Sequence, residues 1–130
     1  MYLAGNAHPE IQFSVHQCAQ FTHTPRKSHG VAIKRIGRYL QGVLQRGDGL
    51  CFESTGTLQL DFHVDSDFSG LWCYEDDQDP VCVSSRTGYD MTLSECPIHW
   101  VSQLQTEIAL STCESEYIAL AQAMRDSIPL

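Results

Sequence analysis

The sequence has few basic residues, no closely spaced pair of cysteines and no long apolar segment. No apolar run approaches the roughly 20 residues that a helix needs to cross a bilayer, so membrane-spanning helices are not expected. The first residues, MYLAGNAHPE, lack the basic and apolar regions of a secretory signal. We therefore expect an intracellular protein, cytoplasmic or nuclear, with no membrane partner.

Cysteine is present, but its spacing does not indicate a disulfide framework or a metal site. The six cysteines are widely spread, and none belongs to a C-x-x-C pair. Without a secretory signal, a reducing compartment is expected, and free thiols with it. The six histidines do not complete a zinc-finger or zinc-ribbon spacing either. Structural zinc is therefore not expected.

The charged residues divide the chain into a basic and an acidic part. Residues 1–50 hold six Lys and Arg against two acids, a net charge of +4. Residues 51–130 hold two Lys and Arg against fourteen acids, a net charge of −12. This division favours contact with a polyanion by the first part and cation binding by the second.

The first fifty residues are predicted to be mainly helical. After a turn at Thr24-Pro25, we expect a long helix with Ser28 as its N-cap and Gly47 at its carboxyl end. Its apolar face comprises Ala32, Ile36, Tyr39, Leu40 and Val43. Its basic face comprises Lys27, Lys34 and Arg38, flanked by Arg35. These four side chains are either the solvated face of an amphipathic helix or a surface for nucleic-acid phosphates.

Residues 50–102 read as strands and turns. A short strand is expected at 50–53, a turn at 54–56 and an alternating strand at 58–65, with Asp65 at its polar end. Residues 70–85 form an acidic loop, in which Trp72 and Tyr74 either anchor the loop or stack on bases. Two more strands, at 86–93 and 98–102, surround a turn at 94–97. Consecutive strands with such connections favour an antiparallel meander.

A last helix is predicted from about Thr112 to Ser127, with Ser111 and Glu114 as its capping box. Its apolar stripe is expected to comprise Tyr117, Leu120, Ala121, Met124 and Ile128. Glu116 lies beside this stripe, in line with Ala119 and Ala123. Small residues on that line would let the helix lie close to a sheet and bring Glu116 over it.

Carboxylates on the strand and on the helix are candidate metal ligands. Magnesium prefers hard oxygen ligands, and two-metal nucleases use about three or four carboxylates from different elements. Asp65 and Glu116 meet that description, with Asp61 and Asp67 near the first of them. Spacing alone leaves open whether they bind metal or are ordinary carboxylates at a strand end and a helix start.

Several longer motifs occur in a fixed order: YLAGNAHPEIQFSVHQCAQFTHTPRKSH, AIKRIGRYLQG, VDSDFSG, SRTGY and LQTEIALSTCESEYIALAQAM. In this order and spacing they resemble the carboxy-terminal part of Copia-type retrotransposon polyproteins. The resemblance implies an α/β (α+β) chain in two parts. Residues 1–50 would be a helical remnant of the reverse transcriptase connection. Residues 51–130 would be the amino-terminal part of a ribonuclease H-like domain, truncated to a three-stranded antiparallel sheet plus a helix.

The resemblance also implies a chemistry. Asp65 matches the family's first catalytic aspartate and Glu116 the catalytic glutamate of the helix, so both are expected to hold Mg²⁺. The family enzyme cleaves the RNA strand of RNA–DNA hybrids. The hybrid or another nucleic acid is then the expected partner of Lys27, Lys34, Arg35 and Arg38.

The sequence departs from the family in ways that matter for activity. The family's later catalytic aspartates have no counterpart here, so little or no nuclease activity is expected from this chain alone. The strand at 58–65 would lack one neighbour, which favours self-association through its open edge. Ser94-Glu95 replaces a frequent Gly-Gly in the hairpin turn, so strain is expected there. Two alternatives are a non-enzymatic module that binds nucleic acid or protein, and a nuclease completed by dimerisation.

Overall fold

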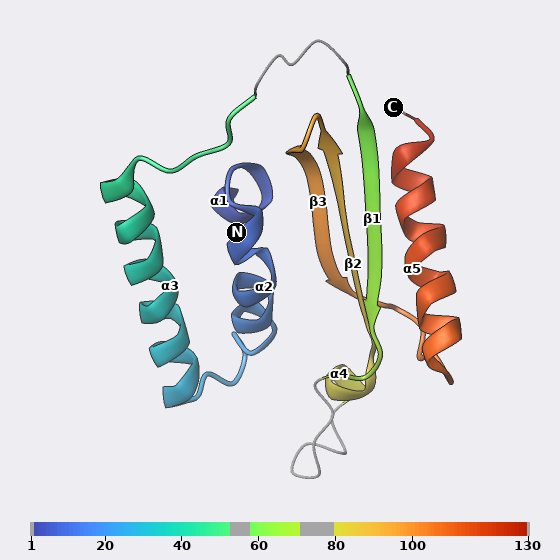
Figure 1. Ribbon diagram of the computed structural model, residues 1–130. Helices are drawn as coiled ribbons and strands as arrows, with labels where there is room; N and C mark the ends of the chain where they lie inside the picture. Colours follow the sequence, from blue (N-terminus) through green and yellow to red (C-terminus); the bar gives the residue numbers. More distant parts are fainter. Residues whose placement is uncertain (1, 53–57, 71–79, 130) are drawn as a thin grey trace. The chain divides into compact units, whose positions relative to one another are not determined.

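The chain forms two compact units, Met1–Thr57 and Leu58–Leu130. The computed structural model describes residues 2–52, 58–70 and 80–129 (Figure 1). The expected turn at 54–56 and most of the acidic loop, with Trp72 and Tyr74, lie outside these residues. Within them, no helix combines the length and apolar character that membrane crossing needs. The assignment of the two parts to a connection region and a ribonuclease H-like domain stays a prediction.

The first unit is helical, as predicted. It contains α1 (Tyr2–Asn6), a short 3₁₀ helix η1 (Pro9–Ile11), α2 (Gln12–Gln20) and the long α3 (Lys27–Arg46). The predicted apolar face of α3 turns inward, with Val43 buried and Ala32, Ile36 and Leu40 partly buried. Tyr39, at the margin of this face, is 43% exposed.

The predicted end of α3 is confirmed, but its predicted start is wrong. Gly47 closes the helix in the left-handed conformation, with φ of 73°, which glycine adopts at little cost. The N-cap is Arg26 and not Ser28, which lies inside the helix. The His29 ring takes the capping role by accepting a hydrogen bond of 3.2 Å from the Arg26 backbone N–H. The cap therefore uses a side chain from the first turn of the helix and not the expected serine hydroxyl.

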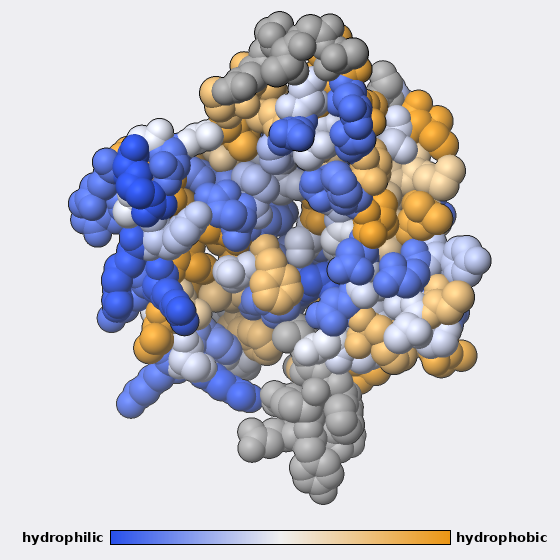
Figure 2. Space-filling view, in the orientation of Figure 1, coloured by the Kyte–Doolittle hydropathy of each residue, from blue (hydrophilic) through white to orange (hydrophobic). Residues whose placement is uncertain are grey.

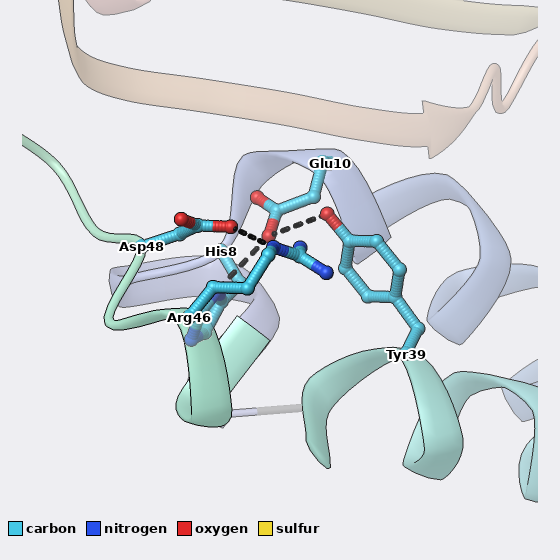
Figure 3. A network of polar contacts seen from close by, with 5 residues as sticks. All are labelled: His8, Glu10, Tyr39, Arg46 and Asp48. Carbon is cyan, nitrogen blue, oxygen red and sulfur yellow. Dashed lines mark hydrogen bonds and ion pairs between the residues drawn. The ribbon is translucent and has the colours of Figure 1, made fainter. Parts of the chain in front are cut away.

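A carboxylate joins η1 to α3 (Figure 3). The Glu10 carboxylate lies 2.9 Å from Nδ1 of His8 and accepts a hydrogen bond of 3.4 Å from the Tyr39 hydroxyl. Nearby, Arg46 and Asp48 form an ion pair of 2.6 Å after the end of α3. Partial burial, followed by the Glu10 charge, raises the pKa of Tyr39.

The strand predicted at 50–53 is wrong for the residues that the structure describes. Residues 50–52 are neither strand nor helix, and Phe52 is 64% exposed. A short apolar run becomes a strand only where a neighbour pairs with its backbone. No described strand pairs with these residues, since the sheet consists of three later strands.

The second unit contains the predicted antiparallel meander, with strand order β1-β2-β3. Its strands are β1 (Leu60–Asp67), β2 (Arg86–Leu93) and β3 (Cys96–Leu104). A short helix that was not predicted, α4 (Pro80–Val83), precedes β2. Because β1 begins and ends two residues later than predicted, Asp65 lies within the strand and not at its end.

The β2–β3 turn has the geometry that the sequence indicated. Ser94 has φ of 49° and Glu95 has φ of 66°, both in the left-handed region. Two-residue hairpin turns of this kind match the twist of the strands, and they favour Asn-Gly or Gly-Gly. Ser94 and Glu95 therefore adopt the left-handed conformations of such a turn and carry the strain that glycine would avoid.

One long helix, α5 (Thr112–Ser127), packs across β1 and β2 (Figure 1). The predicted bounds are confirmed, and the Ser111 hydroxyl accepts a hydrogen bond of 3.1 Å from the Glu114 backbone N–H. The buried face is the line of small residues, since Ala119 is 0% and Ala123 1% exposed. Large sheet residues, Tyr89 and Met91, fill the space beneath.

The predicted apolar stripe of α5 is wrong as a buried face. Its side chains are mostly solvent-exposed: Tyr117 69%, Leu120 46%, Met124 50% and Ile128 77%. The helix lies too close to the sheet for such large side chains, so the small ones face inward. Figure 2 shows hydrophobic side chains gathered on the surface over α5.

Candidate functional site

Asp65 and Asp67 share one face of β1 but have different surroundings. Asp67 lies across from Arg86, and its carboxylate covers Gly70, where an added Cβ would clash with it. Burial lowers the pKa of Arg86, and the negative charge of Asp67 opposes that shift. Asp65 lies across from Gly88 and is exposed, and its side chain makes no hydrogen bond or ion pair with a described residue. Asp65 thus lacks the charged neighbour that Asp67 has across the strand pair.

The opposite face of β1 lies under α5. Side chains alternate along a strand, so Phe62, Val64 and Ser66 share this face, away from Asp65. Phe62 stacks on Tyr89 at 5.8 Å between ring centroids, and the Tyr89 hydroxyl donates a hydrogen bond to Asp126 of α5. Burial and the Asp126 charge raise the pKa of Tyr89. These contacts fix α5 on the sheet.

A buried glutamine, which was not predicted to have a role, joins three elements. The side-chain nitrogen of Gln105 lies 3.4 Å from the Ser66 hydroxyl, 3.1 Å from the Thr87 hydroxyl and 2.9 Å from the Ser115 carbonyl. Gln105 is 6% exposed and Ser115 0%. Ser66 follows Asp65 and Ser115 precedes Glu116, so Gln105 contacts the residues next to both candidate ligands.

Glu116 lies near the start of α5 and is exposed. On the helix it lies on the flank opposite Ile118, Gln122 and Arg125, at 100° per residue. Those three side chains line a hollow of about 550 Å³ together with Thr106 and Glu107, which follow β3. The Glu116 flank therefore faces away from this hollow. Asp65 lies on the face of β1 opposite to the one that α5 covers.

The structure does not bring the two carboxylates into contact with each other. No group of three or more His, Cys, Asp or Glu side chains suited to a metal occurs among residues 2–52, 58–70 and 80–129. Asp61 accepts a hydrogen bond of 2.9 Å from Gln59, and His63 lies 3.5 Å from Asp90 at the surface. The roles of Asp65 and Glu116 as metal ligands stay predictions.

Four basic residues of the first unit are exposed on α3. Lys27, Lys34 and Arg38 share one face and Arg35 flanks it, opposite the buried Val43. None of the four forms an ion pair with a described residue, and Figure 2 shows hydrophilic side chains over this helix. The geometry is compatible with phosphate contact, and no observation here tests that role.

Comparison with known proteins places the whole chain among transposon sequences. It is 37% identical over 128 residues, 98% of its length, to "Retrovirus-related Pol polyprotein from transposon TNT 1-94" of Nicotiana tabacum. It is 35% identical over 113 residues to the polyprotein from transposon RE1 of Arabidopsis thaliana. The chain spans only 9% and 7% of these two relatives.

A shorter relative matches over the same length of chain. "Secreted RxLR effector protein 161" of Plasmopara viticola is 33% identical over 128 residues, which make up 83% of that protein. No family model matches the chain, and no solved structure matches it.

Proposed function

Because this chain belongs to the Copia-type retrotransposon polyproteins, we propose that Asp65 and Glu116 are the first two metal ligands of a ribonuclease H-like site. Both are exposed carboxylates, which suits the hard oxygen donors that Mg²⁺ prefers. The bound metal would supply an activated water and neutralise charge on the scissile phosphate of the RNA strand. The names of the relatives describe whole polyproteins and assign no role to these two residues, so their nuclease role is our proposal.

The observation that carries the proposal is the position of Gln105. It contacts the side-chain hydroxyl of Ser66 and the backbone carbonyl of Ser115, the residues next to the two carboxylates, although these lie 51 positions apart in the sequence. A metal site needs ligands from separate elements at fixed positions, and buried hydrogen bonds provide such positioning. Gln105 donates these bonds, so it would position the ligands without binding metal itself.

We also propose that this chain alone cleaves hybrids slowly or not at all. Two carboxylates leave most of the coordination sphere of Mg²⁺ to water, so the ion is held weakly. The site would be completed by carboxylates from other parts of the polyprotein. Without those further carboxylates, the site formed by Asp65 and Glu116 would bind a divalent cation but would not support efficient cleavage.

The basic surface on α3 would hold the nucleic acid. Lys27, Lys34, Arg35 and Arg38 offer four positive charges to phosphates, and each phosphate contact releases counterions. Such binding is independent of base sequence and weakens as salt rises. A module that only binds nucleic acid would show this behaviour without any contribution from Asp65.

Manganese titration followed by NMR tests the metal site without relying on activity. Mn²⁺ should broaden the backbone signals of residues around Asp65 and Glu116, and Asp65→Asn should remove most of that effect. Asp90→Asn is the matched control, a surface carboxylate on β2 that should leave the broadening in place. Equal broadening in wild type and Asp65→Asn would contradict the proposed site.

Hybrid binding and cleavage separate the enzyme from the binding module. An RNA–DNA hybrid should bind the wild-type chain, and Lys34→Ala with Arg38→Ala should weaken it about tenfold at low salt. Cleavage with Mg²⁺ should be at most slow and should be lost in Asp65→Asn. Efficient cleavage that survives Asp65→Asn would exclude this residue as a catalytic ligand.

A further inference from the structure

A second hollow, of about 510 Å³, lies between α2 and α3 in the first unit. Ligand sites in proteins have volumes of roughly 300–1,000 Å³, so this α2–α3 hollow has room for a ligand. All the residues that line it belong to one continuous part of the chain, residues 10–39. Ile11, Ala32 and Ile36 contribute to a lining that is mainly apolar.

Two aromatic side chains from different helices line the α2–α3 hollow and stay exposed to solvent. Phe13 of α2 is 48% exposed, and Tyr39 of α3 is 43% exposed. Figure 3 shows the Tyr39 hydroxyl directed toward Glu10, and their hydrogen bond of 3.4 Å fixes that end of the ring. Exposed aromatic rings in a hollow are surfaces on which a planar ligand can stack.

The α2–α3 hollow also contains an amide group without a partner. Gln17 lines the hollow, and its side-chain nitrogen is buried and makes no hydrogen bond to a described residue. A buried N–H donor that lacks an acceptor costs free energy, so a ligand that supplies an acceptor is favoured. Nucleobases carry carbonyl and ring-nitrogen acceptors at their edges, and glutamine amides bind such edges.

Arg35 joins the α2–α3 hollow to the basic face of α3. It lines the hollow, and it also flanks the face formed by Lys27, Lys34 and Arg38. At 100° per residue, Arg35 lies between Tyr39 and Arg38 around the helix. Residues 1–50 carry a net charge of +4. Phosphates bound along the basic face would therefore lie at the edge of the hollow.

A carboxylate in the lining restricts what can enter the α2–α3 hollow. Glu10 lines it and lies 2.9 Å from Nδ1 of His8. Its negative charge repels phosphates and free anionic compounds, whereas an uncharged base meets no such repulsion. The base of a nucleotide is thus the part that suits the hollow, with its phosphates outside at Arg35.

We propose that the first unit binds single-stranded nucleic acid, with the base of one unpaired nucleotide in the α2–α3 hollow. This inference rests on the phosphate contacts proposed above for the basic face of α3. The base stacks on Phe13 and Tyr39 and accepts a hydrogen bond from Gln17. Arg35 and Arg38 contact the adjoining phosphates. Proteins that bind single strands combine basic surfaces with aromatic rings in this way.

Abasic oligonucleotides test this proposal, because they keep every phosphate and lack the bases. Fluorescence anisotropy of the full chain at low salt should show that single-stranded oligothymidylate binds about tenfold more tightly than an abasic strand of the same length. Equal affinity for the two strands would overturn the base site while leaving the phosphate contacts in place. If neither strand bound, the phosphate contacts on which the inference rests would be overturned with it.

Variants of the aromatic residues test the same contact from the side of the protein. Phe13→Leu keeps an apolar side chain but removes the ring, so it should weaken oligothymidylate binding about tenfold. Tyr39→Leu should have a similar effect. A blunt RNA–DNA hybrid should bind both variants as it binds wild type, because its paired bases cannot enter the hollow.

Phe52→Leu is the matched control for these variants. It makes the same change at a ring of the first unit that is 64% exposed and lies outside the α2–α3 hollow, so binding of oligothymidylate should not change. Circular dichroism identifies any variant that fails to fold. Wild-type affinity for oligothymidylate in folded Phe13→Leu and Tyr39→Leu would overturn the proposal.

Discussion

The side-chain amide of Gln105 donates a hydrogen bond of 2.9 Å to the backbone carbonyl of Ser115, inside the contact between α5 and the sheet. Gln105→Met keeps the side-chain volume but removes this bond and the one to the buried Thr87 hydroxyl, while the Ser115 carbonyl keeps its partner within α5. Burying unsatisfied polar groups costs about 1–3 kcal/mol of unfolding free energy, and we expect a loss in that range. Urea denaturation measures it.

The matched control for this change is Gln41→Met, the same substitution at an exposed position of α3. Its effect should stay within about 0.5 kcal/mol, because surface substitutions rarely cost more. Equal stability of Gln105→Met and wild type would show that the hydrogen bonds of Gln105 do not hold α5 in place. The positioning role proposed for Gln105 would then be lost as well.

The β2–β3 turn offers a prediction of increased stability. Ser94 and Glu95 have φ of 49° and 66°, where a Cβ costs about 1–2 kcal/mol relative to ordinary conformations. Ser94→Gly and Glu95→Gly should each raise the unfolding free energy by about 1 kcal/mol, after the greater chain entropy of glycine is subtracted. Thermal and urea denaturation check the result. Glu107→Gly, at a loop position without a positive φ, should instead lower stability slightly.

The elements that sequence predicted well are those fixed by local chemistry. Gly47, Ser111 and the alternation along β1 determine where helices and strands begin or end, so most of the meander and α5 were predicted correctly. The Ser94-Glu95 strain was also predictable, because it follows from two residues. The line of Ala119 and Ala123 was expected to lie close to the sheet, which the structure confirms. The apolar stripe was misjudged, since Tyr117 and Leu120 look like core residues but are exposed.

The candidate site was predictable only in part, because its arrangement depends on how distant elements pack together. The resemblance identified Asp65 and Glu116 as neighbours in function, and the alternation along the strand placed Asp65 on its polar face. The alternation that places Phe62 under α5 places Asp65 on the other face. In the sequence, Gln105 is only a polar residue just after a strand. Its structural role could not be predicted, because its three hydrogen-bond partners come from distant segments.

Close packing of α5 predicts unequal effects of two neighbouring enlargements. Ala119 is 0% exposed against the sheet, so Ala119→Leu forces the helix outward and should cost at least about 2 kcal/mol of unfolding free energy. Ala121→Leu adds the same atoms to an exposed position and should change stability by less than about 0.5 kcal/mol. Urea denaturation of both variants measures the two changes in unfolding free energy. Equal costs would contradict the small-residue contact.

The hydrogen bond from Tyr89 to Asp126 predicts a loss of stability in alkaline solution. Burial, followed by the hydrogen bond and the charge of Asp126, raises the pKa of Tyr89 above its ordinary value of 10.0. The folded state then binds the phenol proton more tightly than the unfolded state does. The resulting stabilisation is complete below about pH 10 and declines as pH rises further.

Tyr89→Phe isolates this contribution. Wild type should lose unfolding free energy above about pH 10, and Tyr89→Phe should show a smaller decline over the same range. At neutral pH the variant should be less stable by about 1–2 kcal/mol, because a hydrogen bond to a charged group is lost. Tyr117→Phe removes a phenol that is 69% exposed and should keep the wild-type pH dependence. If Tyr89→Phe and wild type declined in parallel above that pH, Tyr89 would not be the group responsible.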